Sequence, residues 1–180
     1  MAYHRLGDTP NVIVDGSPTA STRLTLSHWP GSPTPTALQD DLSAQIAFHA
    51  LDSPDVLHGI EVVSNNHFDQ DGLASAYALI DPQAALARRA QVIDVASAGD
   101  FAVFEDRASM RIAMALAAYD DPDRSPLGQS AFGGGYEDQC AALYEGLLPK
   151  FTELLDHPDR VRSLWEAEDA HLTELSLIHI

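Results

Sequence analysis

Three side chains that can bind a metal ion stand at alternate positions in one short stretch, at His67, Asp69 and Asp71. Alternate residues of an extended chain point the same way, so one imidazole and two carboxylates can converge without long-range folding. Carboxylate oxygens suit hard divalent cations such as Mn²⁺ and Mg²⁺, and imidazole shifts the preference toward Mn²⁺, Fe or Zn²⁺. We therefore predict a divalent metal site here. The apolar run Ile60–Val63 before it is expected to be an interior strand, and Gly72 lets the backbone turn into a helix.

The segment from His67 to Ser75, HFDQDGLAS, resembles the first motif of the DHH phosphoesterase superfamily, His-x-Asp-x-Asp-Gly-x-x-Ser. In that superfamily the motif lies at a strand end and binds a pair of metal ions. The resemblance implies a Rossmann-like DHH half and a metal-dependent phosphoesterase that uses a metal-activated water. The Asp-His-His motif that names the superfamily does not occur in the chain. A non-catalytic protein with the DHH-like fold, or a binding module, is therefore the alternative.

Two other interpretations of the same stretch stay open. Polar residues after a strand can be a solvated loop, and Asp-x-Asp-Gly strings also arise by chance. Haloacid-dehalogenase-like phosphatases carry Asp-x-Asp-Gly-Thr, which would make Asp69 a nucleophile and Asp71 an acid. That motif starts at the tip of its strand, whereas polar residues 64–67 intervene here, and Leu73 replaces Thr or Val. The only lysine, Lys150, lies far downstream in a region expected to be helical.

Four further residues are weaker candidates for the metal site: Asp15, His28, Asp94 and Asp100. Asp15 ends the apolar run NVIVD, and His28 ends the run STRLTLSH. These two runs are expected to form a hairpin or to be neighbouring strands, and in one sheet their ends would join the predicted site. Asp94 and Asp100 are candidates because the DHH superfamily uses an additional Asp after its first motif. Packing against Trp29 or capping a loop is the alternative role for His28, and capping is the alternative role for Asp100.

The chain is strongly acidic, with ten Lys and Arg against 27 Asp and Glu and a formal net charge of −17. Such a field repels nucleic acid and anionic membranes, so we expect neither long nucleic acid nor a membrane as a partner. Bound cations reverse the local potential. The expected substrate is therefore a small phosphorylated molecule held through metal ions. Nothing in the sequence indicates an oligomeric state.

Cys140 is the only cysteine, so neither a disulfide framework nor a thiolate metal site is expected. The first nine residues lack the apolar core of a signal peptide, and no apolar run reaches the length of a membrane span. We therefore expect a cytoplasmic protein.

The expected fold class is α/β, with a small, mainly parallel sheet flanked by helices and a helical C-terminal part. Strand-like runs cluster before residue 66 and helical patterns follow it. We expect an α/β domain over 1–130 and an incomplete helical extension over 131–174. Helices are expected at 36–50, 82–95 and 109–119, and from 136 to 174 with breaks at Pro149 and at His157–Pro158.

The last six residues, LSLIHI from Leu175 to Ile180, match the translation of a transposon-end adapter used in sequencing libraries. We therefore expect the natural sequence to depart from this one near Glu174. The tail is excluded from the fold prediction for that reason.

Overall fold

The sheet is small and parallel. In the computed structural model, which describes residues 1–178 and side chains as far as Leu175, three strands have the order β2-β1-β3. The central strand β1 (Asn11–Val14) pairs in parallel with β2 (Thr22–Leu26) and with β3 (Val63–Ser64). Val12 is the register partner of both Leu24 and Val63. The α/β class with a small parallel sheet is confirmed.

Of the two arrangements expected for the runs around β1 and β2, the structure shows neighbouring strands, which pair in parallel and do not form a hairpin. One expectation about the strands needs correction. The interior strand is β1, whose four residues are all buried, as is usual for a central parallel strand. The expected interior strand Ile60–Val63 is instead an edge, and only Val63 and Ser64 have strand geometry. Residue 60 follows Gly59, which turns the chain with a φ of 74°.

Eight α-helices occur in the described part of the chain: α1 (Ser43–Asp52), α2 (Gln70–Ile80), α3 (Pro82–Leu86), α4 (Arg89–Phe101), α5 (Arg107–Asp120), α6 (Tyr136–Leu147), α7 (Phe151–Asp156) and α8 (Glu166–Ile178). The expected breaks at Pro149 and Pro158 are confirmed, since both lie in 3₁₀ turns between helices. The expected helix over 36–50 begins only at Ser43. The expected helix over 82–95 is interrupted after Leu86, and its second part continues to Phe101.

Helix α2, which follows the predicted metal stretch, is almost wholly buried. It contacts α1 and α4 along much of its length, and Gly99 of α4 lies so close to Gln70 that a Cβ there would be 2.5 Å from the Gln70 Cβ. Tyr77 of α2 meets Phe151 of α7 edge to face, with ring centroids 5.0 Å apart. One hydrophobic cluster therefore joins helices from both sides of residue 130.

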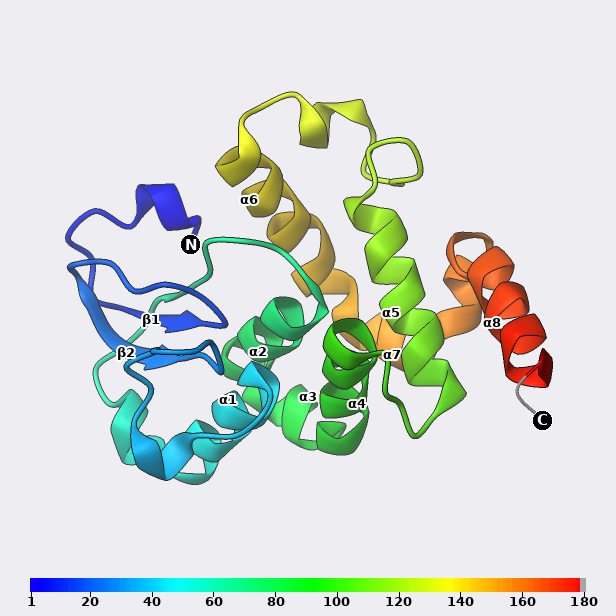
Figure 1. Cartoon of the computed structure of the whole chain (residues 1–180). Helices are drawn as coiled ribbons and strands as arrows, with labels where there is room; N and C mark the ends of the chain where they lie inside the picture. Colours follow the sequence, from blue (N-terminus) through cyan, green and yellow to red (C-terminus); the bar gives the residue numbers. More distant parts are fainter. Residues whose placement is uncertain (179–180) are drawn as a thin grey trace.

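Figure 1 shows the sheet at one end of the molecule and α8 at the other, with α2, α4 and α5 between them. Helix α8 is fastened to α5 by Arg107, whose Nε lies 2.6 Å from Asp169 Oδ1. Within the described residues, no helix is both long enough and apolar enough to cross a membrane.

The suspected adapter tail, Leu175–Ile180, lies mostly outside the residues whose side chains are described. Helix α8 includes its first residues as far as Ile178, and the Leu175 side chain is 44% exposed. Residues 179 and 180 are outside the described part of the chain.

Candidate functional site

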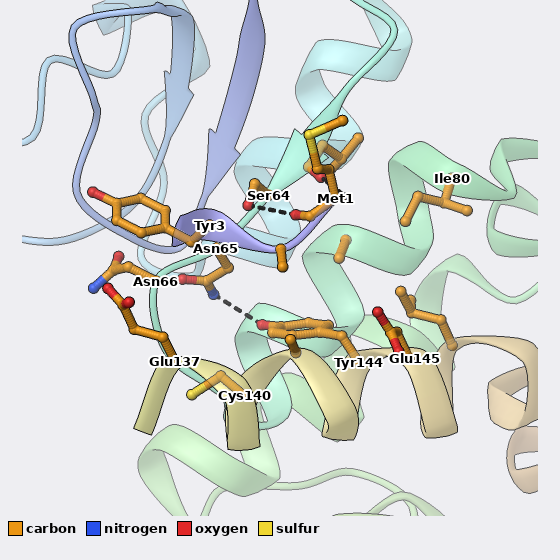
Figure 2. Close-up of a pocket in the computed structure, with 15 residues that line it drawn as sticks. Met1, Tyr3, Ser64, Asn65, Asn66, Ile80, Glu137, Cys140, Tyr144 and Glu145 are labelled. Carbon is orange, nitrogen blue, oxygen red and sulfur yellow. Dashed lines mark hydrogen bonds between the residues drawn. The ribbon is translucent and has the colours of Figure 1, made fainter. Parts of the chain in front are cut away.

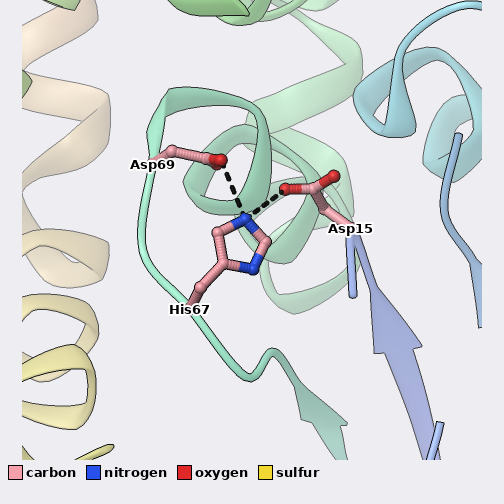
Figure 3. Close-up of side chains that lie close together, drawn as sticks. All are labelled: Asp15, His67 and Asp69. Atoms are coloured by element: carbon pink, nitrogen blue, oxygen red, sulfur yellow. Dashed lines mark hydrogen bonds and ion pairs between the residues drawn. The ribbon is translucent and has the colours of Figure 1, made fainter. Parts of the chain in front are cut away.

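Asp15, His67 and Asp69 meet at the carboxyl edge of the sheet (Figure 3). Asp15 directly follows β1 and has a φ of 45°, a left-handed conformation that Asp adopts more readily than most residues. His67 lies in the loop between β3 and α2. Asp69 caps α2, because the Gly72 N–H donates a 2.7 Å hydrogen bond to Asp69 Oδ1. This edge is where open α/β sheets bind their ligands.

One oxygen of Asp15 is buried without a hydrogen bond. His67 Nε2 lies 2.8 Å from Asp69 Oδ2 and 3.1 Å from Asp15 Oδ2. A ring nitrogen carries a single proton, and the hydrogen bond of His67 Nε2 is to Asp69. Asp15 is only 1% exposed, and its Oδ2 has no hydrogen-bond partner among the described residues. Such an oxygen is costly unless a cation or a donor satisfies it.

A second group of possible ligands shares Asp15. The ligand atoms of Asp15, His28 and Asp71 lie within 4.8 Å of one another. Asp71 is completely buried, and its carboxylate accepts hydrogen bonds of 2.8 and 2.7 Å from the backbone N–H groups of Ser43 and Ala44, which open α1. His28 Nε2 is 3.7 Å from Asp15 Oδ1. Asp15 therefore stands between two groups, each with one more carboxylate and one imidazole.

The structure distributes the predicted ligands differently from the expectation. Asp69 and Asp71 belong to different groups, so a single ion touching both does not follow from the described side chains. Asp15, only a weaker candidate from the sequence, is common to both groups. Asp100 borders the second group, with Oδ2 3.6 Å from His28 Nε2. Asp94 belongs to neither group, because its carboxylate accepts hydrogen bonds from the backbone N–H groups of residues 105 and 106.

The two competing interpretations of the motif expected other geometry. A solvated loop would leave Asp69 and Asp71 in water, whereas Asp71 is completely buried. The dehalogenase motif would put Asp69 on the strand tip with Lys150 reaching toward it. The strand ends at Ser64, and no described ion pair joins Lys150 to Asp69.

Several pKa shifts follow from packing carboxylates together. Burial, with repulsion from Asp15, raises the pKa of Asp71 to about 7. Burial and the charge of Asp69 also raise the pKa of Asp15, against the opposing effect of His67. Burial lowers the pKa of His67, but its interactions with Asp15 and Asp69 outweigh burial and raise the pKa to about 10. Such shifted pKa values, gathered at one edge of a sheet, are typical of a functional site.

Residues that sequence reasoning missed hold the ligands in place. Ser43 Oγ–H donates a 2.8 Å hydrogen bond to Asp15 Oδ1. Asn66 Oδ1 accepts from the Ser17 N–H at 2.8 Å, which ties the loop after β3 to the loop after β1. A Cβ on Gly16 would lie 2.3 Å from that Asn66 oxygen, so any larger residue there would displace the Asn66 side chain. In the sequence, the adjacent Asn65 and Asn66 before His67 are the one local feature that could have indicated these supporting hydrogen bonds.

A separate cavity of about 190 Å³ adjoins this support (Figure 2). It lies between the N-terminal residues, β3 and α6, and its lining is mainly apolar, with Val63, Ile80 and Leu148 among the lining residues. Asn65 Nδ2 donates a 3.0 Å hydrogen bond to the Tyr144 hydroxyl at the cavity wall. Asn65 Oδ1 accepts from the His67 N–H at 3.2 Å, so this wall also supports the loop that carries His67.

Almost every described cation is already paired with an acid elsewhere, as Arg88 is with Asp156 and Arg124 is with Glu168. No described Lys or Arg forms an ion pair with Asp15, Asp69, Asp71 or Asp100. Among the described side chains, His28 and His67 alone form ion pairs with the carboxylates of the two groups.

Comparison with known proteins gives a family but no activity. No curated protein and no solved structure matches the chain. A family model matches residues 1–177, and on that match the chain belongs to a family of unknown function, DUF6687.

Proposed function

We propose that the protein is a divalent-metal-dependent phosphoesterase that acts on a small phosphorylated molecule. The observation that carries this proposal is Asp15, a buried carboxylate shared by two His/Asp groups, whose Oδ2 has no hydrogen bond among the described residues and only the 3.1 Å ion pair with His67. The single buried cysteine agrees with a reducing compartment, so the proposal includes a cytoplasmic location.

The residues fit a pair of divalent cations. Asp15, His67 and Asp69 would hold one ion, and Asp15, His28 and Asp71 would hold the other. Carboxylates and imidazoles without a thiolate suit Mn²⁺ or Mg²⁺, with Mn²⁺ favoured by the histidines. Such ions lower the pKa of a coordinated water and offset the charge of a phosphoryl group.

The protein's own residues would keep this donor set in place. The Gly72 N–H and the Ser43 hydroxyl orient Asp69 and Asp15, and the first turn of α1 holds both oxygens of Asp71. Partners of this kind fix the direction of metal ligands and are needed for full affinity. Because α2 is packed against α1, Asp69 and Asp71 are held at the start of a rigid helix.

The absence of a basic side chain in the described part of the site limits the substrate. Outside the metal groups, a long polyanion would be repelled by the net charge of −17. A small phosphate ester needs only the cations. The same absence favours the second candidate, a non-catalytic DHH-like protein that binds metal without turnover.

Hydrolysis of p-nitrophenyl phosphate and of its bis-ester, with Mn²⁺ present and after EDTA, separates the two candidates. A phosphoesterase would show Mn²⁺-dependent release of nitrophenol that Asp69→Asn reduces at least 100-fold. Asp94→Asn is the matched control, because it removes an acidic charge outside both groups. Mn²⁺ binding without turnover of either ester would reject the enzyme and leave the binding protein.

A further inference from the structure

A groove of about 430 Å³ adjoins the second metal group. It is formed by the loop after β2 and the segment before α1, and its lining includes His28, Trp29, Gln39, Asp40 and Asp41. His28 belongs to both places, because its Nδ1 is 2.6 Å from the Asp41 carbonyl oxygen while its Nε2 faces Asp15 and Asp100. A molecule bound in the groove would therefore lie next to the proposed metal pair.

Trp29 gives the groove an aromatic surface. Its ring lies against His67, with ring centroids 5.0 Å apart and planes tilted by 40°. The residue is nevertheless 37% exposed, although indole is among the most hydrophobic side chains. Packing against His67 holds the ring in place, and the exposed part of it is free to contact a ligand.

The groove carries acceptors and negative charge. Asp40 and Asp41 line it, and the basic side chain in its described lining is His28, whose Nε2 already faces Asp15 and Asp100. Asp40 already accepts from the Asp41 N–H and lies 3.5 Å from His49 Nε2, whereas no described side-chain hydrogen bond uses the Asp41 carboxylate. An exposed indole face attracts organic ammonium groups, and the carboxylates that line the same groove add a favourable charge.

We propose that the Trp29 groove binds an ammonium group, and that the substrate is an aminoalkyl phosphate whose phosphate faces the metal groups. The substrate part rests on the proposed function, whereas the ammonium part rests on the groove alone. A zwitterion of this kind matches both ends of the site, since its cation meets Trp29 and Asp41 and its anion meets the metal ions. It also accounts for a phosphate-binding site that lacks basic side chains in its described part.

Choline and 3,3-dimethylbutan-1-ol provide the test, because they have nearly the same shape and differ in charge. Calorimetry on the metal-free full chain is expected to show saturable choline binding to one site, and binding of the neutral alcohol at least tenfold weaker. Trp29→Leu and Asp41→Asn are each expected to weaken choline binding at least fivefold. Asp55→Asn, an exposed acidic residue outside the groove, removes the same charge and is expected to leave the affinity unchanged.

Equal affinity for choline and the neutral alcohol would overturn the ammonium site. Equal losses of choline affinity in Asp41→Asn and Asp55→Asn would also overturn it. Circular dichroism of each variant confirms that it is folded. Phosphocholine with Mn²⁺ then tests the substrate part, since it is expected to bind at least tenfold more tightly than choline and to lose that gain in Asp15→Asn. Choline binding without any Mn²⁺ binding would uphold the groove and reject the metal site, so the two failures are distinguishable.

Discussion

Asn65 Nδ2 donates a 3.0 Å hydrogen bond to the hydroxyl of Tyr144, a residue 79 positions later on α6. The same Asn65 side chain accepts the N–H of His67 through Oδ1. A helix from the C-terminal half of the chain therefore supports the loop that carries two of the proposed ligands. Gly72 completes this contact, because a Cβ there would lie 2.4 Å from Asn65 Nδ2 and 2.6 Å from the Tyr144 oxygen.

Tyr144→Phe removes the hydroxyl while keeping the ring. We expect a stability loss of about 1 kcal/mol and a threefold to tenfold loss of Mn²⁺ affinity, because Asn65 no longer holds the His67 loop. Tyr77→Phe is the control, since it removes a hydroxyl that is hydrogen-bonded to Thr152 away from the site. Urea denaturation and Mn²⁺ calorimetry of both variants check this. Equal Mn²⁺ affinities would show that Tyr144 is only structural.

Gly16→Ala tests the close approach of the two loops. The added Cβ would lie 2.3 Å from Asn66 Oδ1 and 2.7 Å from Asn65 Oδ1, so the asparagines have to move. We expect a loss of about 1–3 kcal/mol in the free energy of unfolding, together with weaker Mn²⁺ binding. Gly135→Ala adds the same atom at a position where, apart from the adjoining residues, no atom lies within 4 Å. It is expected to change the free energy of unfolding and the Mn²⁺ affinity very little. A Gly16→Ala protein with unchanged stability and metal affinity would contradict the packing.

The parallel sheet and most helices could be predicted from the sequence because their signals are local. The apolar run at 11–14 and the prolines at 149 and 158 act within a few residues. The central role of Asp15 could not be predicted, because it follows from which strand lies between the other two. The sequence also could not predict that Asp69 and Asp71 belong to different groups. It depends on the first turn of α1, which binds Asp71 from 27 and 28 residues away.

The metal-free protein is expected to lose stability as the pH rises from 6 to 9. Burial raises the pKa of Asp71 to about 7, and interactions with Asp15 and Asp69 overcome burial to raise that of His67 to about 10. Between the unfolded and folded pKa of each group, the native state holds a proton that the unfolded chain has released. The stabilisation that each group contributes is therefore complete at low pH, and it is lost as the pH rises through the pKa of that group in the folded state. Asp69, whose pKa is lowered in the fold, also stabilises the native state, and this stabilisation is already complete above about pH 4.

Divalent cations should reverse this trend, because they bind the deprotonated ligands. Urea midpoints measured from pH 6 to 9 are expected to fall in EDTA and to rise with excess Mn²⁺. A midpoint that rises with pH in EDTA would show that the buried acids do not carry the proposed shifts.

Asp15→Asn is expected to stabilise the metal-free protein at pH 8. The pKa of Asp15 is raised by burial and by the neighbouring Asp69, so its ionised form is disfavoured in the fold. Asn keeps the shape and tolerates the left-handed backbone at this position. Asp94→Asn should instead destabilise the protein, because the Asp94 carboxylate accepts two backbone hydrogen bonds. Urea denaturation in EDTA decides the sign, and a destabilised Asp15→Asn protein would argue against charge repulsion at the site.

The most direct test of the shared Asp15 is the number of Mn²⁺ ions bound, measured by calorimetry with electron paramagnetic resonance of free Mn²⁺. Since a chain of charge −17 attracts cations in general, the titration uses physiological salt and Asp94→Asn as the control. We predict two specific ions in the parent protein and in Asp94→Asn. The Asp69→Asn protein should still bind one Mn²⁺ ion. The Asp15→Asn protein should bind both ions more than 100-fold more weakly than the parent protein does. An Asp15→Asn protein that still binds two Mn²⁺ ions with parent affinity would contradict the site.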